Sequence, residues 1–367
     1  MGRFARSSTL AVALTAIGLL MPGVGPAQTS GNQPDIVINA ATRAEVIEGV
    51  LKHLNDAYVF PEVAKRMEAA IRLRVQRKEY EQITSATTLA RTLTSHLQEV
   101  SRDKHLQVLF NYEPRPLPAL QRNPTPEQLG EFRRSALSQS SSINHGFKRV
   151  ERLDGNLGYL RVDLLVDPEF GGDTAAAAMS FVSNTHALII DLRNCNGGVP
   201  EMVALLSTYL FEGQPVHLND IYERASNRTQ QFWTLPYVSG KRYAGKDVYI
   251  LTSSRTASAA EEFAYNLQQL KRATIVGEVS AGAANPGGGV RINEHFQVFV
   301  PTGRAINPVT GTNWEGVGVK PDVLVSEEEA LRRAQLVALN KLIETSTDEG
   351  WKTRWKARIE NLQQQPR

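Results

Sequence analysis

The chain has 367 residues, with 41 Lys+Arg against 38 Asp+Glu, and its hydrophobic content of 41% is ordinary for a globular protein with a sizeable core. Cys195 is the only cysteine, which excludes an internal disulfide framework and a multi-cysteine zinc site. The formal charge of +3 comes without any Lys/Arg-rich run and does not indicate nucleic-acid binding. The length predicts two domains, or one large domain with an appendage.

Residues 1–27 have the pattern of an export signal peptide. Two arginines precede an apolar stretch from Leu10 to Leu20, and Gly25-Pro26-Ala27 supplies a cleavage site with small residues. The stretch is shorter than the ~20 residues that span a bilayer, so no stable membrane span is predicted. The alternative is an uncleaved anchoring N-terminus. The signal carries two arginines and no acid, so the exported form, periplasmic or extracellular, has a charge of +3 − 2 = +1.

Residues 28–110 are predicted to form an N-terminal helical subdomain after a short leader. Thr42-Arg43-Ala44-Glu45 has the spacing of a capping box and predicts the start of a helix. Pro61 opens a second helix, and leucines at helical spacing predict a third from Thr87 to Val100. Leu106 to Phe110 is expected to leave this bundle as a strand.

The rest of the chain reads as an α/β domain. Residues 111–150 are rich in Pro, Gln, Ser and Asn and predict an irregular linker with one short helix that begins at Thr125. In residues 151–345 buried strands alternate with helices, which predicts a mainly parallel sheet. Residues 346–367 are predicted to be a polar C-terminal tail.

Two strand-to-helix junctions carry chemically useful residues. One buried strand ends at Asp191 and leads into Gly197-Gly198, whose backbone N–H groups are unobstructed by a Cβ and suit an oxyanion hole. Another ends at Thr252 and leads to Ser258 at a helix N-terminus, where the local field favours an oxyanion. Both junctions are expected at one crevice of the sheet. An ordinary turn and a helix cap remain alternatives, and spacing does not rank the four hydroxyl residues Ser253, Ser254, Thr256 and Ser258.

Three segments in this order resemble the S41 family of serine peptidases, which includes the tail-specific, carboxyl-terminal processing and tricorn-core enzymes. They are Asp191-Leu192-Arg193-Asn194-Cys195-Asn196-Gly197-Gly198, Thr256-Ala257-Ser258-Ala259-Ala260-Glu261 and Trp314-Glu315-Gly316-Val317-Gly318-Val319-Lys320-Pro321-Asp322. The linker is too short for a PDZ domain, so the chain is most similar to the PDZ-less branch that resembles interphotoreceptor retinoid-binding protein. The resemblance implies a crotonase/ClpP-like ββα catalytic domain with a small N-terminal helical-bundle subdomain.

The resemblance also implies the site residues. Ser258 falls on the family's nucleophile, and the oxyanion hole would use the N–H of Gly197 or Gly198 together with that of Ala259. In the tricorn-like branch a His before the catalytic domain is the general base and a Glu after the nucleophile supports it; these positions fall on His105 and Glu315.

The tail-specific branch instead uses a Lys as the base. Ala283 occupies the place of that Lys in this sequence, which argues against a Ser–Lys dyad. Lys271 lies about 20 Å along the helix from Ser258, too far to replace it. Glu261 and Glu262 are expected to complement the helix dipole in the first turn rather than to act as catalytic acids.

The sequence therefore predicts an exported serine peptidase that cleaves peptide or protein substrates through an acyl-enzyme on Ser258. No metal, organic cofactor or nucleic-acid partner is expected. The alternative is a non-catalytic binding module for apolar ligands, of retinoid or fatty-acid type, on the same scaffold. The substrate and the oligomeric state are not set by the sequence.

Overall fold

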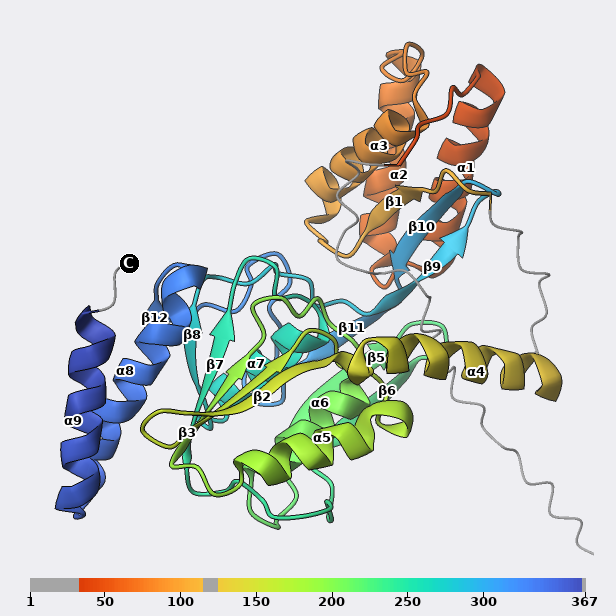
Figure 1. Ribbon diagram of the computed structural model, residues 1–367. Helices are drawn as coiled ribbons and strands as arrows, with labels where there is room; N and C mark the ends of the chain where they lie inside the picture. Colours follow the sequence, from red (N-terminus) through yellow and green to blue (C-terminus); the bar gives the residue numbers. More distant parts are fainter. Residues whose placement is uncertain (1–32, 115–124, 365–367) are drawn as a thin grey trace, which may run out of the picture.

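The computed structural model describes residues 33–114 and 125–364. The predicted export signal lies outside these residues. Figure 1 shows a mixed α/β protein in which a helical N-terminal part stands on a larger part built around a sheet. This confirms the predicted fold class. None of the helices in the described ranges is long and apolar enough to cross a membrane.

A six-stranded sheet forms the centre of the larger part. All its neighbouring strands are parallel except the β2–β3 pair, as the alternation of strands and helices predicted. In spatial order the strands are β12 (Val323–Leu324), β8 (Thr274–Gly277), β7 (Asp247–Thr252), β4 (Ala187–Asp191), β3 (Leu157–Val162) and β2 (Phe147–Leu153).

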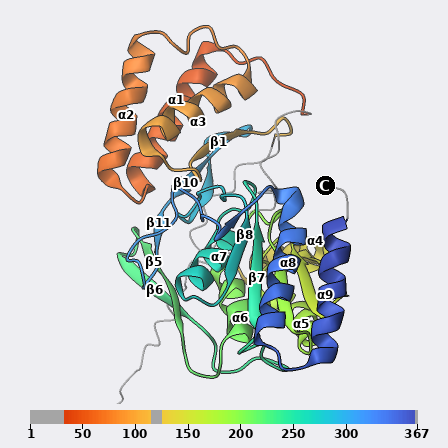
Figure 2. The ribbon, with the colours of Figure 1, turned by 90° about the vertical axis from the view of Figure 1, so that its left-hand side faces the viewer.

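Helices cover both faces of this sheet because its strands are apolar on both sides. In β4, Leu188 and Ile190 join one core cluster, whereas Ala187 and Ile189 join another. The first cluster is closed by α5 (Pro168–Val182), α6 (Pro200–Leu210) and α7 (Ala259–Gln269). The second is closed by α8 (Glu327–Thr345) and α9 (Glu349–Gln364), which lie side by side in Figure 2.

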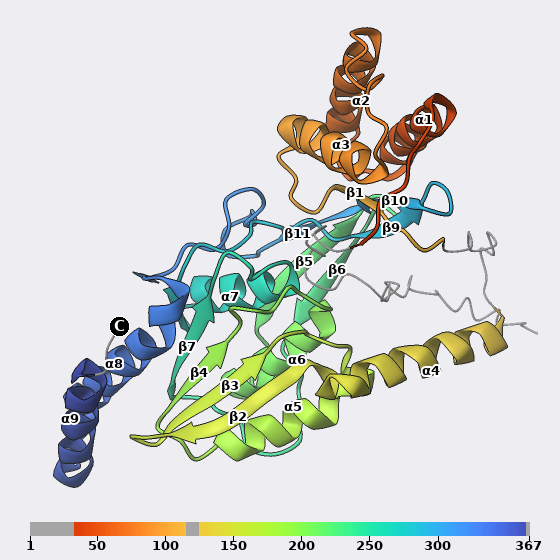
Figure 3. The ribbon, with the colours of Figure 1, turned by 45° about the horizontal axis from the view of Figure 1, so that its top comes forward.

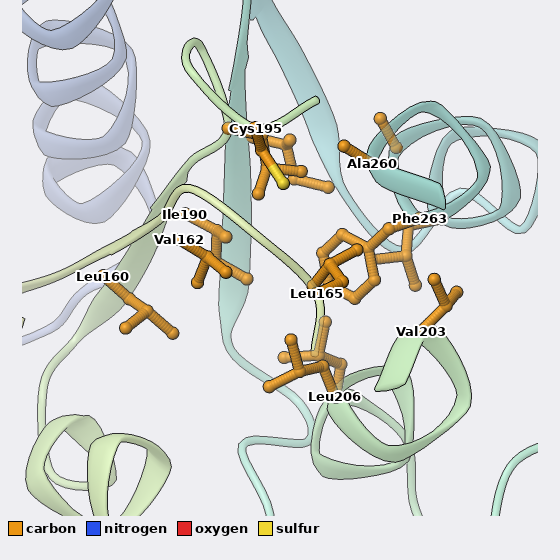
Figure 4. Close-up of a cluster of buried hydrophobic side chains, with 14 of the residues drawn as sticks. Leu160, Val162, Leu165, Ile190, Cys195, Val203, Leu206, Ala260 and Phe263 are labelled. Atoms are coloured by element: carbon orange, nitrogen blue, oxygen red, sulfur yellow. The ribbon is translucent and has the colours of Figure 1, made fainter. Parts of the chain in front are cut away.

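The first cluster lies directly beneath the two junctions. Figure 4 shows Cys195, from the loop after β4, beside Leu165 and facing Ala260 and Phe263 of α7. All four side chains are buried, so apolar packing holds the two junctions together. Burial also raises the pKa of the Cys195 thiol to about 12, which keeps it protonated and unreactive.

The N-terminal part is completed by a hairpin from far downstream. It contains α1 (Ala40–Ala57), α2 (Pro61–Gln76), α3 (Ala86–Ser101) and β1 (Gln107–Phe110). β1 pairs antiparallel with β10 (Phe296–Pro301), which pairs with β9 (Gly287–Arg291). Phe296, Val298 and Val300 pack into the core of the helices. The predicted subdomain 28–110 is therefore only part of this folding unit, whose helices stand above the six-stranded sheet in Figure 3.

Two predicted helix starts had different outcomes. The capping box at Thr42 is wrong, because α1 begins at Ala40 and the Asn39 side chain accepts the Thr42 N–H at 2.9 Å. The cap at Thr125 is confirmed, with the Thr125 hydroxyl and the Gln128 side chain each accepting the other's backbone N–H. However, α4 (Pro126–Ser142) is a long helix rather than a short one.

Other segments also differ from the prediction. A short 3₁₀ turn, η1 (Asn144–Gly146), and the start of β2 at Phe147 fall inside the predicted irregular linker. The predicted polar tail is wrong, because α9 buries Trp355 and Leu362 against the sheet and Trp355 Nε1 donates to the Gly155 carbonyl at 3.0 Å. A third sheet was not predicted as such and consists of β11 (Gly303–Ile306), β5 (His217–Glu223) and β6 (Arg228–Trp233).

Candidate active site

The Gly-Gly turn after β4 packs directly against Ser258. A Cβ placed on Gly197 would lie 2.8 Å from Ser258 Cβ and 3.2 Å from its Oγ, so only glycine fits there. The turn is held by Leu165, whose N–H donates to the Gly197 carbonyl at 2.9 Å and whose carbonyl accepts the Val199 N–H at 2.9 Å. The structure thus brings Gly197 and Ser258 into contact, as expected for two junctions that lie at one crevice of the sheet.

Ser258 has an unusual backbone conformation, with φ 56° and ψ −126°. Few non-glycine residues adopt a positive φ, and such strain persists only where the surroundings enforce it. The Ser258 N–H donates to Glu261 Oε2 at 2.9 Å, and its carbonyl accepts the Glu262 N–H at 2.9 Å as α7 begins. The serine therefore sits at a sharp turn at the N-terminus of a helix.

The structure separates the four hydroxyl residues that spacing could not rank. Ser253 and Thr256 are buried, and their hydroxyls donate to the carbonyls of Arg193 at 2.6 Å and Leu192 at 2.8 Å. These bonds fasten one junction to the other. Ser254 is exposed away from these contacts, whereas Ser258 is half-buried against Gly197. Ser258 is the hydroxyl residue at the site.

Backbone donors without acceptors surround this serine. Among the hydrogen bonds of the described residues, none uses the N–H of Gly197, Gly198 or Ala259 as a donor. Amides of this kind beside a hydroxyl nucleophile can stabilise the oxyanion of an acyl-transfer intermediate.

His105 and Glu315 meet in a second cluster together with Asp103. One nitrogen of His105 and one oxygen from each carboxyl group lie within 4.8 Å of one another. His105 stacks on Phe299 of β10 with ring centroids 5.5 Å apart. Glu315 Oε1 accepts the Lys104 N–H at 2.9 Å, so the carboxylate binds the main chain beside the histidine.

Burial controls the protonation of this cluster. It lowers the pKa of His105 to about 4, against an opposing backbone hydrogen bond with Asn285. It raises the pKa of Glu315 to about 7, and the nearby Asp103 charge adds to this shift while three backbone N–H groups oppose it. At neutral pH the imidazole is therefore uncharged, which is the form that accepts a proton.

Asp103 is a residue of this cluster to which the sequence analysis assigned no role. It accepts hydrogen bonds from the Tyr58 hydroxyl at 3.0 Å, Asn285 Nδ2 at 3.1 Å and the His105 N–H at 3.1 Å. These bonds tie α1, the turn after α3 and the downstream segment together. Its position two residues before His105 was the available signal.

No hydrogen bond joins Ser258 to His105 in residues 33–114 and 125–364. The two clusters are linked instead through residues 280–285, which we call the bridging segment. Glu261, three residues after Ser258, accepts the N–H groups of Gly282 and Ala283. Glu315 accepts those of Ala284 and Asn285. Glu261 lies in the first turn of α7, as expected, but its side chain also binds the bridging segment.

The Asp103, His105 and Glu315 groups are also the residues that could approach a metal ion in the described part of the chain. Nitrogen and carboxylate oxygen are suitable zinc donors. However, both oxygens of each carboxyl group already accept hydrogen bonds from the protein. The donor set therefore fits a hydrogen-bonded proton-transfer cluster better than a metal site.

Comparisons with known proteins agree with this geometry. The family model for peptidase family S41 matches residues 156–325, and the model for the N-terminal domain of S41 peptidases in eukaryotic IRBP matches residues 35–143. A carboxy-terminal-processing protease of Bartonella bacilliformis is 27% identical over 182 residues, covering 48% of this chain and 40% of that protein. A tail-specific protease of Haemophilus influenzae is 34% identical over 102 residues, covering 26% and 13%.

The chain thus spans less than half the length of these two relatives. Among solved structures, a protein from Parabacteroides merdae described as a peptidase superposes with a TM-score of 0.53 at 14% identity, over 77% of this chain and 90% of that one. At this identity the superposition supports the fold alone.

The fold and the two family models together define a class, that of the proteins built on a peptidase scaffold. Within that class, the chain belongs to peptidase family S41, and its N-terminal region matches the model from the IRBP branch that the sequence predicted.

Proposed function

We propose that this protein is an exported serine peptidase that cleaves peptide bonds through an acyl-enzyme on Ser258. The observation that supports this most directly is the packing of Gly197 against Ser258, beside amides that have no acceptor. A serine held at a helix N-terminus among such donors is placed for acyl transfer.

In the proposed mechanism Ser258 Oγ attacks the carbonyl carbon of the scissile bond while His105 takes the hydroxyl proton. The amides of Ala259 and of Gly197 or Gly198 stabilise the oxyanion of the tetrahedral intermediate. His105 then returns the proton to the leaving amine, and the C–N bond breaks to leave an ester on Ser258. Water, deprotonated by His105, hydrolyses this ester and restores both residues.

Glu315 and Asp103 hold His105 in this scheme. Glu315 fixes the backbone before the histidine, and Asp103 binds the histidine N–H. Because no hydrogen bond joins His105 to Ser258 here, the mechanism requires a bridging water or a small closure of the N-terminal part when substrate binds. Catalytic hydrogen bonds are often long in unliganded enzymes and tighten in the complex.

The test is covalent labelling with a fluorophosphonate probe, which reacts with activated serine hydroxyls. Wild type should become labelled, Ser258→Ala should not, and His105→Ala should react about 10²- to 10⁴-fold more slowly, the usual contribution of a general base. Equal labelling of wild type and Ser258→Ala would show that Ser258 is not the nucleophile.

The substrates in this proposal are peptides or proteins. The curated relatives are described as carboxy-terminal-processing and tail-specific proteases, and the same chain-end preference is part of the proposal. Paired peptides with a free or an amidated C-terminus would test it, since only the free form should be cleaved efficiently. Mass spectrometry of the purified protein would test export, because removal of the signal should leave Gln28 as the N-terminal residue.

The alternative, a binding module for apolar ligands, gains no support from the described structure. A shallow depression lies at the β9–β10 turn, lined by polar residues such as Asn111, Asn293 and Glu294. Pockets for ligands of retinoid size usually have about 300–1,000 Å³ and apolar walls. Binding of a fluorescent fatty acid by a protein that the fluorophosphonate does not label would favour the alternative.

A further inference from the structure

Glu261 binds the nucleophile and the bridging segment with one carboxyl group. Oε2 accepts the Ser258 N–H and the Ala283 N–H, both at 2.9 Å. Oε1 accepts the Gly282 N–H at 2.7 Å and the Ser280 hydroxyl at 2.5 Å. The side chain is completely buried, so these four donors take the place of water.

The carboxyl group has no cationic partner among the ion pairs of the described ranges. Burial raises the pKa of this carboxyl to about 7, while the four hydrogen bonds oppose that shift and hold the donors at fixed positions. One of these donors is the amide of Ser258, whose positive φ is strained. Accepting this N–H compensates part of the strain and keeps Ser258 in its turn.

The bridging segment is held equally firmly at its other end. Glu315 Oε2 accepts the N–H groups of Ala284 at 2.6 Å and Asn285 at 3.0 Å. Two carboxyl groups, the buried one of Glu261 and the half-buried one of Glu315, therefore bind four consecutive amides, Gly282 to Asn285. One carboxyl group also holds the nucleophile, and the other belongs to the cluster around His105.

We propose that Glu261 is a positioning residue, which fixes the turn of Ser258 and, through the bridging segment, the placement of the His105 cluster relative to it. This inference rests on the proposed peptidase function for its kinetic consequence. The contacts that it requires can be tested independently.

Glu261→Gln is the main variant. A glutamine side chain has one acceptor oxygen. Its NH₂ group would face either the N–H groups of Ser258 and Ala283 or the Gly282 N–H and the Ser280 hydroxyl, so either Ser258 or Gly282 loses its acceptor. We expect the maximal rate of fluorophosphonate labelling to fall about 10- to 100-fold, as the loss of buried charge-assisted hydrogen bonds implies. The probe concentration at half-maximal rate and the final labelled fraction should stay at their wild-type values. A purely structural defect would instead reduce the labelled fraction.

Glu262→Gln is the matched control, because Glu262 lies in the same turn of α7 and is also buried, and its side chain has no hydrogen bond to Ser258 or the bridging segment. This control should label at the wild-type rate. Ser280→Ala removes one of the four donors and should give a smaller loss than Glu261→Gln. A wild-type labelling rate in Glu261→Gln overturns the inference.

Hydrogen exchange separates this inference from the proposed function. Amides of residues 282 and 283 should exchange faster in Glu261→Gln than in wild type or Glu262→Gln, whether or not the protein reacts with the probe. If labelling does not depend on Ser258, the peptidase proposal fails while exchange still tests the contacts. Unchanged protection of these amides would overturn the positioning role by itself.

Discussion

At the scale of single residues, the close packing of Gly197 against Ser258 constrains the site. Gly197→Ala would place a Cβ 2.8 Å from Ser258 Cβ, at a φ of 128° that L side chains rarely adopt. We expect fluorophosphonate labelling to slow about 10²-fold, as misplacement of a reacting group by about 1 Å implies. Gly213→Ala is the control, because a Cβ there meets open space. Similar rates for the two variants would contradict the packing.

The buried carboxyl group of Glu262 should make the stability of the protein depend on pH. Burial raises its pKa to about 8, with the Glu201 charge adding to the shift and Asn219 opposing it. The folded state therefore holds a proton that the unfolded chain releases above pH 4.5, the ordinary value. Stability from this group is complete below pH 4.5 and is lost as the pH rises towards 8.

Glu262→Gln should remove this dependence. The free energy of unfolding of wild type should fall relative to that of the variant by up to about 1.4 kcal/mol per pH unit within the window. Urea titrations at several pH values measure the difference. Parallel curves for the two proteins would show that Glu262 is ionised in the folded state.

At the scale of elements, α9 is the clearest case in which composition misled the prediction. Its many polar residues predicted a tail, yet Trp355 is buried against the sheet. Trp355→Ala should lower the free energy of unfolding by about 3–5 kcal/mol, the usual cost of a large-to-small core substitution. Lys356→Ala, at the next and exposed position, should cost little, and chemical denaturation compares the two. The labelling rate of the folded protein should not change in either variant.

The sequence predicted the elements whose signals are local. The alternation of buried strands with helices predicted the parallel sheet. Thr125 and Gln128 predicted the start of a helix. It misplaced the start of α1 because Asn39 and Thr42 both have capping side chains, and spacing does not decide between them. Ser258, Gly197, His105 and Glu315 were assigned to the site through the motifs that resemble the family, and their catalytic roles stay predictions. The role of Glu261 was missed because its partners lie about twenty residues downstream, where no local pattern connects them.

At the scale of the whole molecule, the N-terminal part depends on strands that the later chain provides. β10 fills the middle of the β1-β10-β9 sheet, and its apolar side chains close the helical core. A fragment of residues 33–112 should therefore fail to unfold cooperatively, as followed by circular dichroism. The same fragment joined by a flexible linker to residues 286–302 should regain cooperative unfolding. A cooperative transition in the shorter fragment would show that the helices suffice.

This interleaving also orders events during biosynthesis. The turn that carries His105 contacts Asn285, Phe299 and Glu315, all more than 170 residues later in the chain. A growing polypeptide that has passed the histidine, and even the serine, still lacks the partners that hold the base. Long-range contacts of this kind form late in folding. If the protein acts as proposed, its hydrolytic centre is therefore assembled only after Glu315 has been synthesised, and the growing chain stays inactive until then.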